Sequence, residues 1–161
     1  MKKNKAFFIT EAAMIAAIYV VLTVTINAFN LASGAIQIRI SEALTILPVF
    51  TPAAIPGLFV GCLLSNIFTG CMPWDVVFGS LATLIGAIGT YFLRKKKWCA
   101  SIPPVVANTI IIPVILQYVY HIPDALGYLM LTVGIGELIS AGILGTVLMT
   151  ALNPYKDKLF K

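Results

Sequence analysis

A few charged and amide side chains interrupt a chain that is otherwise strongly apolar, and they are the natural candidates for chemistry. Asn108 and Glu137 stand inside long apolar runs, whereas Glu42, Asn66 and Asp75 stand near the ends of such runs. An ionisable side chain in hydrocarbon costs at least about 2.5–3.5 kcal/mol, so it is normally paired or faces a cavity. Glu137 therefore indicates a polar pocket, or else a structural contact to Asn108 or to a tyrosine.

These residue types are suited to recognising a flat, nitrogen-rich solute. Carboxylates and amides can read the donor and acceptor edge of a heterocycle, while an aromatic ring such as Trp74 or Tyr128 stacks on its face. For several of these residues a purely structural role is an alternative. Glu42 can pair with Arg39, three residues earlier. Asp75 can favour the dipole of a helix N-terminus, and Trp74 can belong to an interfacial aromatic belt.

The sequence contains none of the common motifs for nucleotide hydrolysis or bond cleavage. It lacks a phosphate-binding GxxxxGK[ST] loop, an HExxH zinc motif and a GxSxG nucleophile elbow. His121 is the single histidine, and the three cysteines, Cys62, Cys71 and Cys99, show neither a CxxC nor a Cys/His spacing. We therefore expect no enzyme activity, no metal site and no cofactor in this chain.

Composition places the chain in a membrane. Of its 161 residues, 60% are hydrophobic and 11% are charged, and the mean hydropathy is +0.98. Soluble domains carry about 25% charged residues. At about 20 residues per spanning helix, the chain has room for roughly six spans. We predict an all-α, polytopic membrane protein in which residues 1–161 form one domain, so any energy source must reside in another chain.

Six apolar segments separated by turn and loop signals are predicted to form a compact helical bundle. Thr51-Pro52 favours a tight turn between the second and third segments, because proline lacks a backbone donor and biases the preceding residue away from helix. This turn would return Glu42 to the same side of the membrane as Asn66 and Asp75. The predicted helices cover residues 7–27, 41–50, 53–68, 73–93, 101–120 and 125–152.

Basic residues are gathered beside apolar segments at the two ends of the chain and at residues 94–97. The formal net charge of +5 would also suit a nucleic acid, but no aromatic platform accompanies the run at 94–97. Positive flanks fix orientation toward the cytoplasm, and six crossings place all three groups on one side. We therefore predict cytoplasmic termini and no nucleic-acid partner, with anionic-lipid binding by residues 94–97 as an alternative.

Four alanines, Ala12, Ala13, Ala16 and Ala17, place small side chains four residues apart on the first predicted helix. Small residues let another helix approach closely in lipid. The third predicted helix carries a glycine pair at the same GxxxG spacing. Spacing alone favours packing of the alanines against this protein's own helices.

Two strings in the chain closely resemble a known family. RISEALTILPVFTPAAIPGLFVGCLLSN, at residues 39–66, and WDVVFGSLATLIGA, at residues 74–87, resemble the queuosine-precursor transporter family. Members of that family are the substrate-binding S-components of energy-coupling factor transporters, a bacterial branch of the ATP-binding cassette transporters. The likeness covers nearly the whole chain, from the alanine-rich first helix to the glycine-rich sixth.

The resemblance implies a six-helix protein of the bacterial cell membrane that captures queuine or a related 7-deazaguanine base on the outer face. Its partners would be a membrane scaffold subunit and two cytosolic ATPases, which alone use ATP. An alanine face on the first helix would dock onto the scaffold, which reverses the preference for internal packing. That face is either Ala12 and Ala16 or Ala13 and Ala17. Gln37 in the first outer loop would help to cover the substrate, and the protein would topple in the membrane to release it.

Chemistry and resemblance together suggest a role for each candidate residue. Glu42 and Glu137 are the leading candidates for accepting hydrogen bonds from N1–H and the 2-amino group of the deazaguanine. Asn66 and Asn108 would supply complementary amide contacts, and Asp75 would meet the cation of an aminomethyl precursor. The other predicted contacts are stacking by Trp74 or Tyr128 and a carbonyl contact or loop closure by Arg39.

Two other classes of function stay open. A stand-alone, proton-coupled secondary transporter would use Glu137 as its proton site and would need no ATPase partners. A membrane enzyme acting on lipid would use Glu42, Asp75 and His121 as acid–base groups. It would also need a nearby base or metal cluster that the sequence does not show.

Overall fold

The computed structural model describes residues 5–28 and 38–160, and all regular structure in these ranges is helical. The first half contains α1 (Lys5–Ala28), η1 (Ile40–Val49), α2 (Ala54–Phe68) and α3 (Pro73–Phe92). The second half contains the short turn η2 (Lys97–Cys99), α4 (Ile102–Tyr118), α5 (Leu126–Glu137), η3 (Leu138–Leu144) and α6 (Gly145–Leu152). The described chain ends with η4 (Asn153–Tyr155) and α7 (Lys156–Leu159).

Within the described ranges, four helices are long and apolar enough to cross a membrane. η1 and α2 are also apolar but are shorter. The prediction of an all-α, multi-pass membrane protein is confirmed at this level. The long helices are Lys5–Ala28, Pro73–Phe92, Lys97–Tyr118 and the rod Leu126–Leu159.

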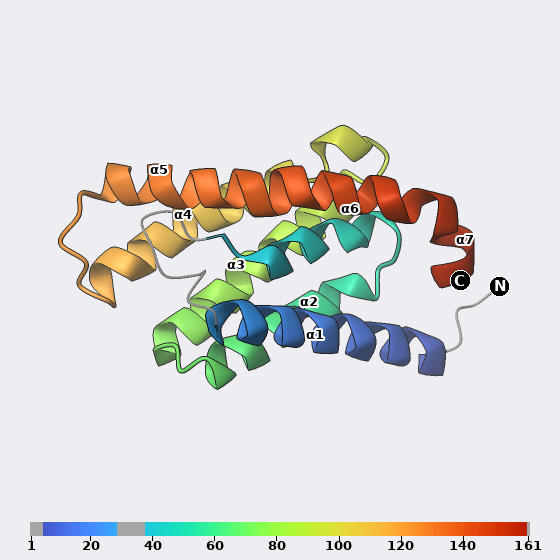
Figure 1. Ribbon diagram of the computed structural model, residues 1–161, viewed down its shortest axis with the longest axis horizontal. Helices are drawn as coiled ribbons and strands as arrows, with labels where there is room; N and C mark the ends of the chain where they lie inside the picture. The colour runs from blue at the N-terminus through green and yellow to red at the C-terminus, as the bar shows by residue number, and fades with distance from the viewer. Residues whose placement is uncertain (1–4, 29–37, 161) are drawn as a thin grey trace.

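The segment predicted as a helix at residues 41–50 is a 3-10 helix, η1, of 10 residues. A 3-10 helix rises about 2.0 Å per residue, so η1 reaches roughly 20 Å, against about 15 Å for an α-helix of equal length. Such long 3-10 runs are uncommon. This one is stabilised by its surroundings, because every side chain from Ser41 to Pro48 is buried. η1 contacts α1, α2, α3, η3 and α6, and Figure 1 shows it in cyan between α1 and the α5–α6 rod.

The last predicted helix, residues 125–152, is one rod with a change of pitch in the middle. α5 passes into the π-helical segment η3 directly after Glu137, and the α-helix resumes at Gly145. π-turns within α-helices are rare and occur frequently at functional sites. Ser140 in η3 is buried, and its Oγ accepts a hydrogen bond from the backbone N of Arg39 (3.1 Å). The π-helical segment therefore anchors the start of η1.

α1 and α2 approach each other through small residues. A Cβ added at Gly57 would lie 2.7 Å from the carbonyl oxygen of Ala12, and one at Gly61 would lie 3.1 Å from the Cα of Ala16. A larger side chain at either glycine would push the helices apart. Packing of alanines against the protein's own helices, which the spacing favours, is thus observed for Ala12 and Ala16.

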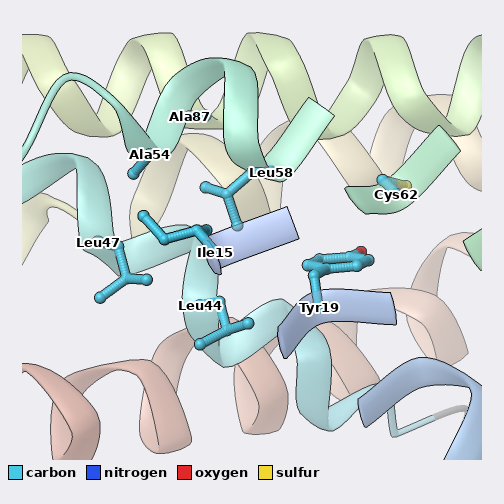
Figure 2. Packing of buried hydrophobic residues seen from close by; sticks show 8 residues of the cluster. All are labelled: Ile15, Tyr19, Leu44, Leu47, Ala54, Leu58, Cys62 and Ala87. Atoms are coloured by element: carbon cyan, nitrogen blue, oxygen red, sulfur yellow. The ribbon is translucent and has the colours of Figure 1, made fainter. Parts of the chain in front are cut away.

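An apolar core fills the space where α1, η1 and α2 meet. Tyr19 lies at its edge, and Figure 2 shows the tyrosine hydroxyl turned away from Ile15 and Leu47. The ring of Tyr19 therefore belongs to the core, while its hydroxyl lies on the side away from Ile15 and Leu47 and donates to Glu42. The buried cluster consists of Ile15, Tyr19, Leu44, Leu47, Ala54, Leu58, Cys62 and Ala87.

The basic segments of the described chain lie at one end of the bundle. α1 begins and α7 ends at the same end in Figure 1. The α3–α4 connection lies there too, because Lys97 Nζ donates to Asn153 Oδ1 (2.7 Å). At the opposite end, Gly70 adopts a φ of +74° in the turn from α2 to α3, a conformation that glycine reaches without strain.

Candidate functional site

Three polar side chains from different helices meet inside the bundle: Glu42 from η1, Asn108 from α4 and Glu137 from the end of α5. Their exposed fractions are 1%, 3% and 6%, respectively. Asn108 Nδ2 donates to Glu42 Oε2 (3.4 Å), and Glu137 lies within electrostatic reach of both residues. The fold thus brings together three predicted binding residues that are far apart in the sequence.

Both carboxylate oxygens of Glu42 have protein donors. The Tyr19 hydroxyl donates to Oε1, and the Asn108 amide donates to Oε2. A buried carboxylate needs such donors because an isolated charge in a low-dielectric interior is costly. Sequence reasoning missed Tyr19, since it treated the first helix as a packing element only. The available signal was position, because Tyr19 follows Ala16 by three residues and so shares the helix face that meets α2.

Glu137 has an oxygen without a protein donor. Its Oε2 is buried and has no hydrogen-bond partner among residues 5–28 and 38–160. A buried acceptor left unsatisfied costs about 1–3 kcal/mol, and more if it is charged. Such groups are few in native structures and call for a physical explanation. A donor on a bound solute would supply the missing hydrogen bond.

Arg39 brings positive charge to the same region. It lies directly before η1, is partly buried, and has Glu42, Asp75 and Glu137 within electrostatic reach. Its guanidinium offers five N–H donors and no acceptor. It can therefore balance the carboxylates or donate to a carbonyl oxygen of a ligand.

Asn66 and Asp75 form a second buried polar group, with exposed fractions of 4% and 6%. Both lie over Gly79, where an added Cβ would be 3.1 Å from Asp75 Oδ1 and 3.2 Å from Asn66 Nδ2. Asp75 Oδ2 accepts a hydrogen bond from the hydroxyl of Tyr120 (2.9 Å). Tyr120 lies just beyond α4. Burial raises the pKa of its hydroxyl above the ordinary value, and the bond to Asp75 adds to this.

The two aromatic residues predicted to stack on a ligand are not in this polar interior. Trp74 is 62% exposed and Tyr128 is 49% exposed. The Trp74 ring packs on Phe78, with ring centroids 6.0 Å apart. Successive residues on an α-helix point about 100° apart, so Trp74 faces outward when Asp75 faces inward. This placement agrees with the interfacial-belt interpretation of Trp74.

A cavity of about 110 Å³ lies between the end of α1, the start of η1 and the end of α2. Among the described residues, its lining includes Arg39 and Asn66 but neither glutamate. Thr23 Oγ1 donates to Ser41 Oγ (2.8 Å) in its wall. Ligand sites typically enclose roughly 300–1,000 Å³, so a heterocycle requires this cavity to widen. Gln37, which was predicted to cover the substrate, lies outside the described residues.

The four alanines of α1 divide into two pairs. Ala12 and Ala16 lie against α2, whereas Ala13 and Ala17 are exposed. The fold therefore leaves the second pair accessible to a helix of another protein. Docking of a partner on either pair stays a prediction.

The polar interior has the chemistry of a recognition site. Carboxylate oxygens, amides and a guanidinium are the groups that hydrogen-bond the edge of a planar heterocycle. In the part of the chain that the structure describes, no three histidine, cysteine, aspartate or glutamate side chains are placed to hold a metal ion.

Comparison with known proteins agrees with a transport role. A protein-family model described as the QueT transporter matches residues 9–154. A curated protein from Lactococcus lactis subsp. cremoris (strain MG1363), named queuosine precursor transporter QueT, is 38% identical over 86 residues. The alignment covers 53% of this chain and 50% of that protein, so the chain spans about half the length of that relative. No solved structure matches the chain. Because the family model covers nearly all of the described helices, this multi-pass membrane protein belongs to the QueT transporter family.

Proposed function

We propose that the protein binds a queuosine precursor, a 7-deazaguanine base such as queuine or its aminomethyl precursor, for uptake into the cell. The name of the L. lactis relative supports this class of substrate. The observation that carries the proposal is the buried, unpartnered Oε2 of Glu137 beside Asn108 and Glu42. This oxygen lacks a donor in the described part of the chain, and the N1–H and 2-amino groups of a deazaguanine are donors.

In the proposed complex, Glu137 accepts a hydrogen bond from the N1–H or 2-amino edge of the base. Asn108 holds Glu42 and lies beside Glu137, so its amide can contact either carboxylate or the base. Arg39 donates to the carbonyl oxygen of the ring. These bonds form in a low-dielectric interior, where each is electrostatically stronger than in water.

Asp75 and Asn66 are proposed to contact the substituent at position seven of the ring. Tyr120 donates to Oδ2 of Asp75, while Oδ1 lies over Gly79 beside Asn66. We propose that Oδ1 meets the ammonium group of an aminomethyl precursor. Binding is proposed as the whole activity of this chain, without catalysis.

We also propose that the chain is the S-component of an energy-coupling factor transporter in a bacterial cell membrane, with six crossings and cytoplasmic termini. η1 and α2 would supply the two short crossings, since they reach roughly 20 Å and 22 Å and are joined by a turn at Pro52. The gathering of basic segments at one end supports a single cytoplasmic face. A scaffold subunit would dock on Ala13 and Ala17, and two cytosolic ATPases would use the ATP.

Replacing Glu137 with glutamine tests the binding site. The glutamine amide removes one acceptor, and a hydrogen bond to a charged group contributes about 1.5–3 kcal/mol. We therefore expect queuine affinity, measured by isothermal titration calorimetry in detergent, to fall about ten- to a hundredfold. Glu11→Gln is the matched control. Glu11 is also buried, at 8% exposure, but it lies in α1 toward the basic end of the bundle.

The outcomes separate the site from the function. Unchanged affinity in Glu137→Gln would remove Glu137 from the site while leaving the function standing. Failure of the wild-type protein to bind any queuosine precursor would overturn the proposed function itself. Equal losses in Glu137→Gln and Glu11→Gln would show a general effect on folding.

A proton-coupled secondary transporter is the second candidate, because Glu137 is a buried carboxyl in a membrane-spanning helix and such groups carry protons in transporters. This candidate predicts accumulation of the precursor by liposomes that contain only this chain and a proton gradient. An S-component alone would bind the precursor without accumulating it. Uptake that requires the scaffold and the ATPases would exclude the second candidate.

A further inference from the structure

A basic cavity of about 220 Å³ lies at the end of the bundle where α1 begins and α7 ends. Arg94 and Lys97 from the α3–α4 connection and Lys156 from α7 line it, with Asp157 as the only carboxylate in the described lining. Three cations against one carboxylate leave this cavity positive. It is therefore suited to an anion.

Two of these cations are held by neutral groups. The Arg94 guanidinium carbon lies 3.9 Å from the centre of the Tyr91 ring, and Lys97 Nζ donates to the side-chain oxygen of Asn153 (2.7 Å). Neither contact neutralises the charge. The side chains are thus oriented while their charge stays available to a ligand.

An apolar groove of about 400 Å³ lies beside the basic cavity. One wall is a face of α1 that includes Phe7, Met14 and Ile18, and the opposite wall includes Leu148 and Leu152 of α6. Leu44 and Leu47 of η1 also contribute to the lining. Thr10 and Glu11 of α1 are the polar residues of the described lining, and the rest of the groove is lined by apolar side chains.

The two hollows are adjacent and share one lining residue. Phe160 lines both of them, and its ring stacks on Phe50 of the basic cavity with centroids 5.3 Å apart. From Phe7 to Ile18 the α1 wall runs about 16 Å, which is about half the thickness of a 30 Å hydrocarbon layer. The groove therefore has the depth of one leaflet, and the positive cavity lies at the end of the groove nearest the basic end of the bundle.

We propose that these two hollows together form a binding site for an anionic phospholipid. The phosphate lies among Arg94, Lys97 and Lys156, and an acyl chain follows the groove along α1. The charge of the cavity selects an anionic head group, and the length and lining of the groove select a lipid over a soluble anion. Basic pockets between helices at a membrane surface are known to bind such head groups. This site is distinct from Glu42 and Glu137 and does not depend on the proposed substrate.

Native mass spectrometry of the whole protein in mixed micelles with equal amounts of phosphatidylglycerol and phosphatidylcholine tests the proposal. We expect wild-type protein to retain phosphatidylglycerol preferentially. The double variant K97Q/K156Q should lose at least about fivefold of that preference, since each juxtamembrane cation contributes a factor of about five. The control is K95Q/K96Q, which removes the same charge from the same region at exposed residues that do not line the cavity. This control variant should keep most of the preference for phosphatidylglycerol.

The groove is tested separately by Leu152→Trp, which fills it and should reduce retention of phosphatidylglycerol. Val147→Trp is its control, because Val147 lies on the same helix and is 61% exposed. Thermal unfolding in detergent verifies that each variant is folded. Equal losses in the two lysine pairs would show diffuse attraction and overturn the site, as would equal retention of the two lipids by the wild type. Displacement of the lipid by excess inorganic phosphate would assign the cavity to a free anion and also overturn the proposal.

Discussion

Replacing Tyr19 with phenylalanine tests how the protein holds a buried carboxylate. The Tyr19 hydroxyl donates to Glu42 Oε1, and both side chains are 1% exposed. Water therefore has little access to replace the lost donor. The phenyl ring keeps its place in the apolar cluster beside Leu58, so the change is confined to one oxygen atom.

The expected loss of stability in Tyr19→Phe depends on the charge of Glu42, which accepts the hydrogen bond. A hydrogen bond to a charged group contributes about 1.5–3 kcal/mol, whereas one between neutral groups contributes about 0.5–1.5 kcal/mol. We expect Tyr19→Phe to lower the free energy of unfolding by about 1.5–3 kcal/mol. In a chain of this size each kcal/mol shifts Tm by roughly 2–4 °C, so Tm should fall by roughly 3–12 °C.

Thermal unfolding in detergent can be followed with a fluorogenic maleimide in a C71S/C99S background, because the remaining Cys62 is buried in the native state beside Tyr19. The control is Tyr128→Phe, which removes the same oxygen from a ring that is 49% exposed. It should change stability by less than about 0.5 kcal/mol. In a Glu42→Gln background, loss of the Tyr19 hydroxyl should cost only the neutral value, which gives a coupling energy on the order of 1 kcal/mol.

Two results would refute this reasoning. Equal Tm values for Tyr19→Phe and Tyr128→Phe would show that the Tyr19 hydroxyl does not stabilise Glu42. Equal costs of Tyr19→Phe with and without Glu42→Gln would show that Glu42 carries no charge in the folded protein. Glu42 would then accept the hydrogen bond from Tyr19 as a neutral carboxyl group.

Three further predictions concern packing, assembly and pH. Gly61→Ala should lower Tm, because the added Cβ would lie 2.8 Å from the Cβ of Tyr19 on α1. Such overpacking costs about 1–3 kcal/mol. Gly127→Ala, with nothing within 4 Å, should not lower Tm. Leucine at both Ala13 and Ala17 should abolish co-purification with the scaffold and ATPases without changing queuine affinity, and intact assembly would place the docking face elsewhere. Because the pKa of Tyr120 is raised in the folded state, its contribution is complete below about pH 10 and is lost above it. Tyr120→Phe should therefore lose less stability than wild type between about pH 9 and 12 in unfolding scans, and parallel curves would contradict this.

The ends of most helices could be predicted from local signals. α3 begins at Pro73, α2 ends at Phe68 and α6 ends at Leu152, all as predicted. Prolines, glycines and basic clusters act on their immediate neighbours, so their effect can be read without knowing the fold. The same is true of the apolar runs between them.

The helix type of two segments could not be predicted from local signals. Residues 41–50 have the composition of an ordinary apolar helix, yet η1 is a 3-10 helix enclosed by five other elements. The turn of π-helix after Glu137 likewise has no distinct local signal. In both cases packing against neighbouring helices outweighs the small local preference for an α-helix.

The candidate site was predictable only in part. Glu42, Asn108 and Glu137 stood out because burying such groups in a membrane is costly, and the structure brings them together. Residue type did not single out Tyr19, and it left two roles open for Trp74. The tyrosine supplies a donor to the buried glutamate, whereas the tryptophan faces outward.

Sequence by itself determined that this chain is helical, resides in a membrane and carries all its basic residues except Arg39 in three groups. These properties depend on the composition of short stretches of sequence, so they can be predicted without knowing the fold. Tertiary structure alone decided which side of each helix faces inward. The reason is that the rotation of a helix about its axis is set by distant contacts, such as those of Gly57 and Gly61 with Ala12 and Ala16. Those contacts turn Tyr19 toward Glu42 and leave Ala13 and Ala17 exposed.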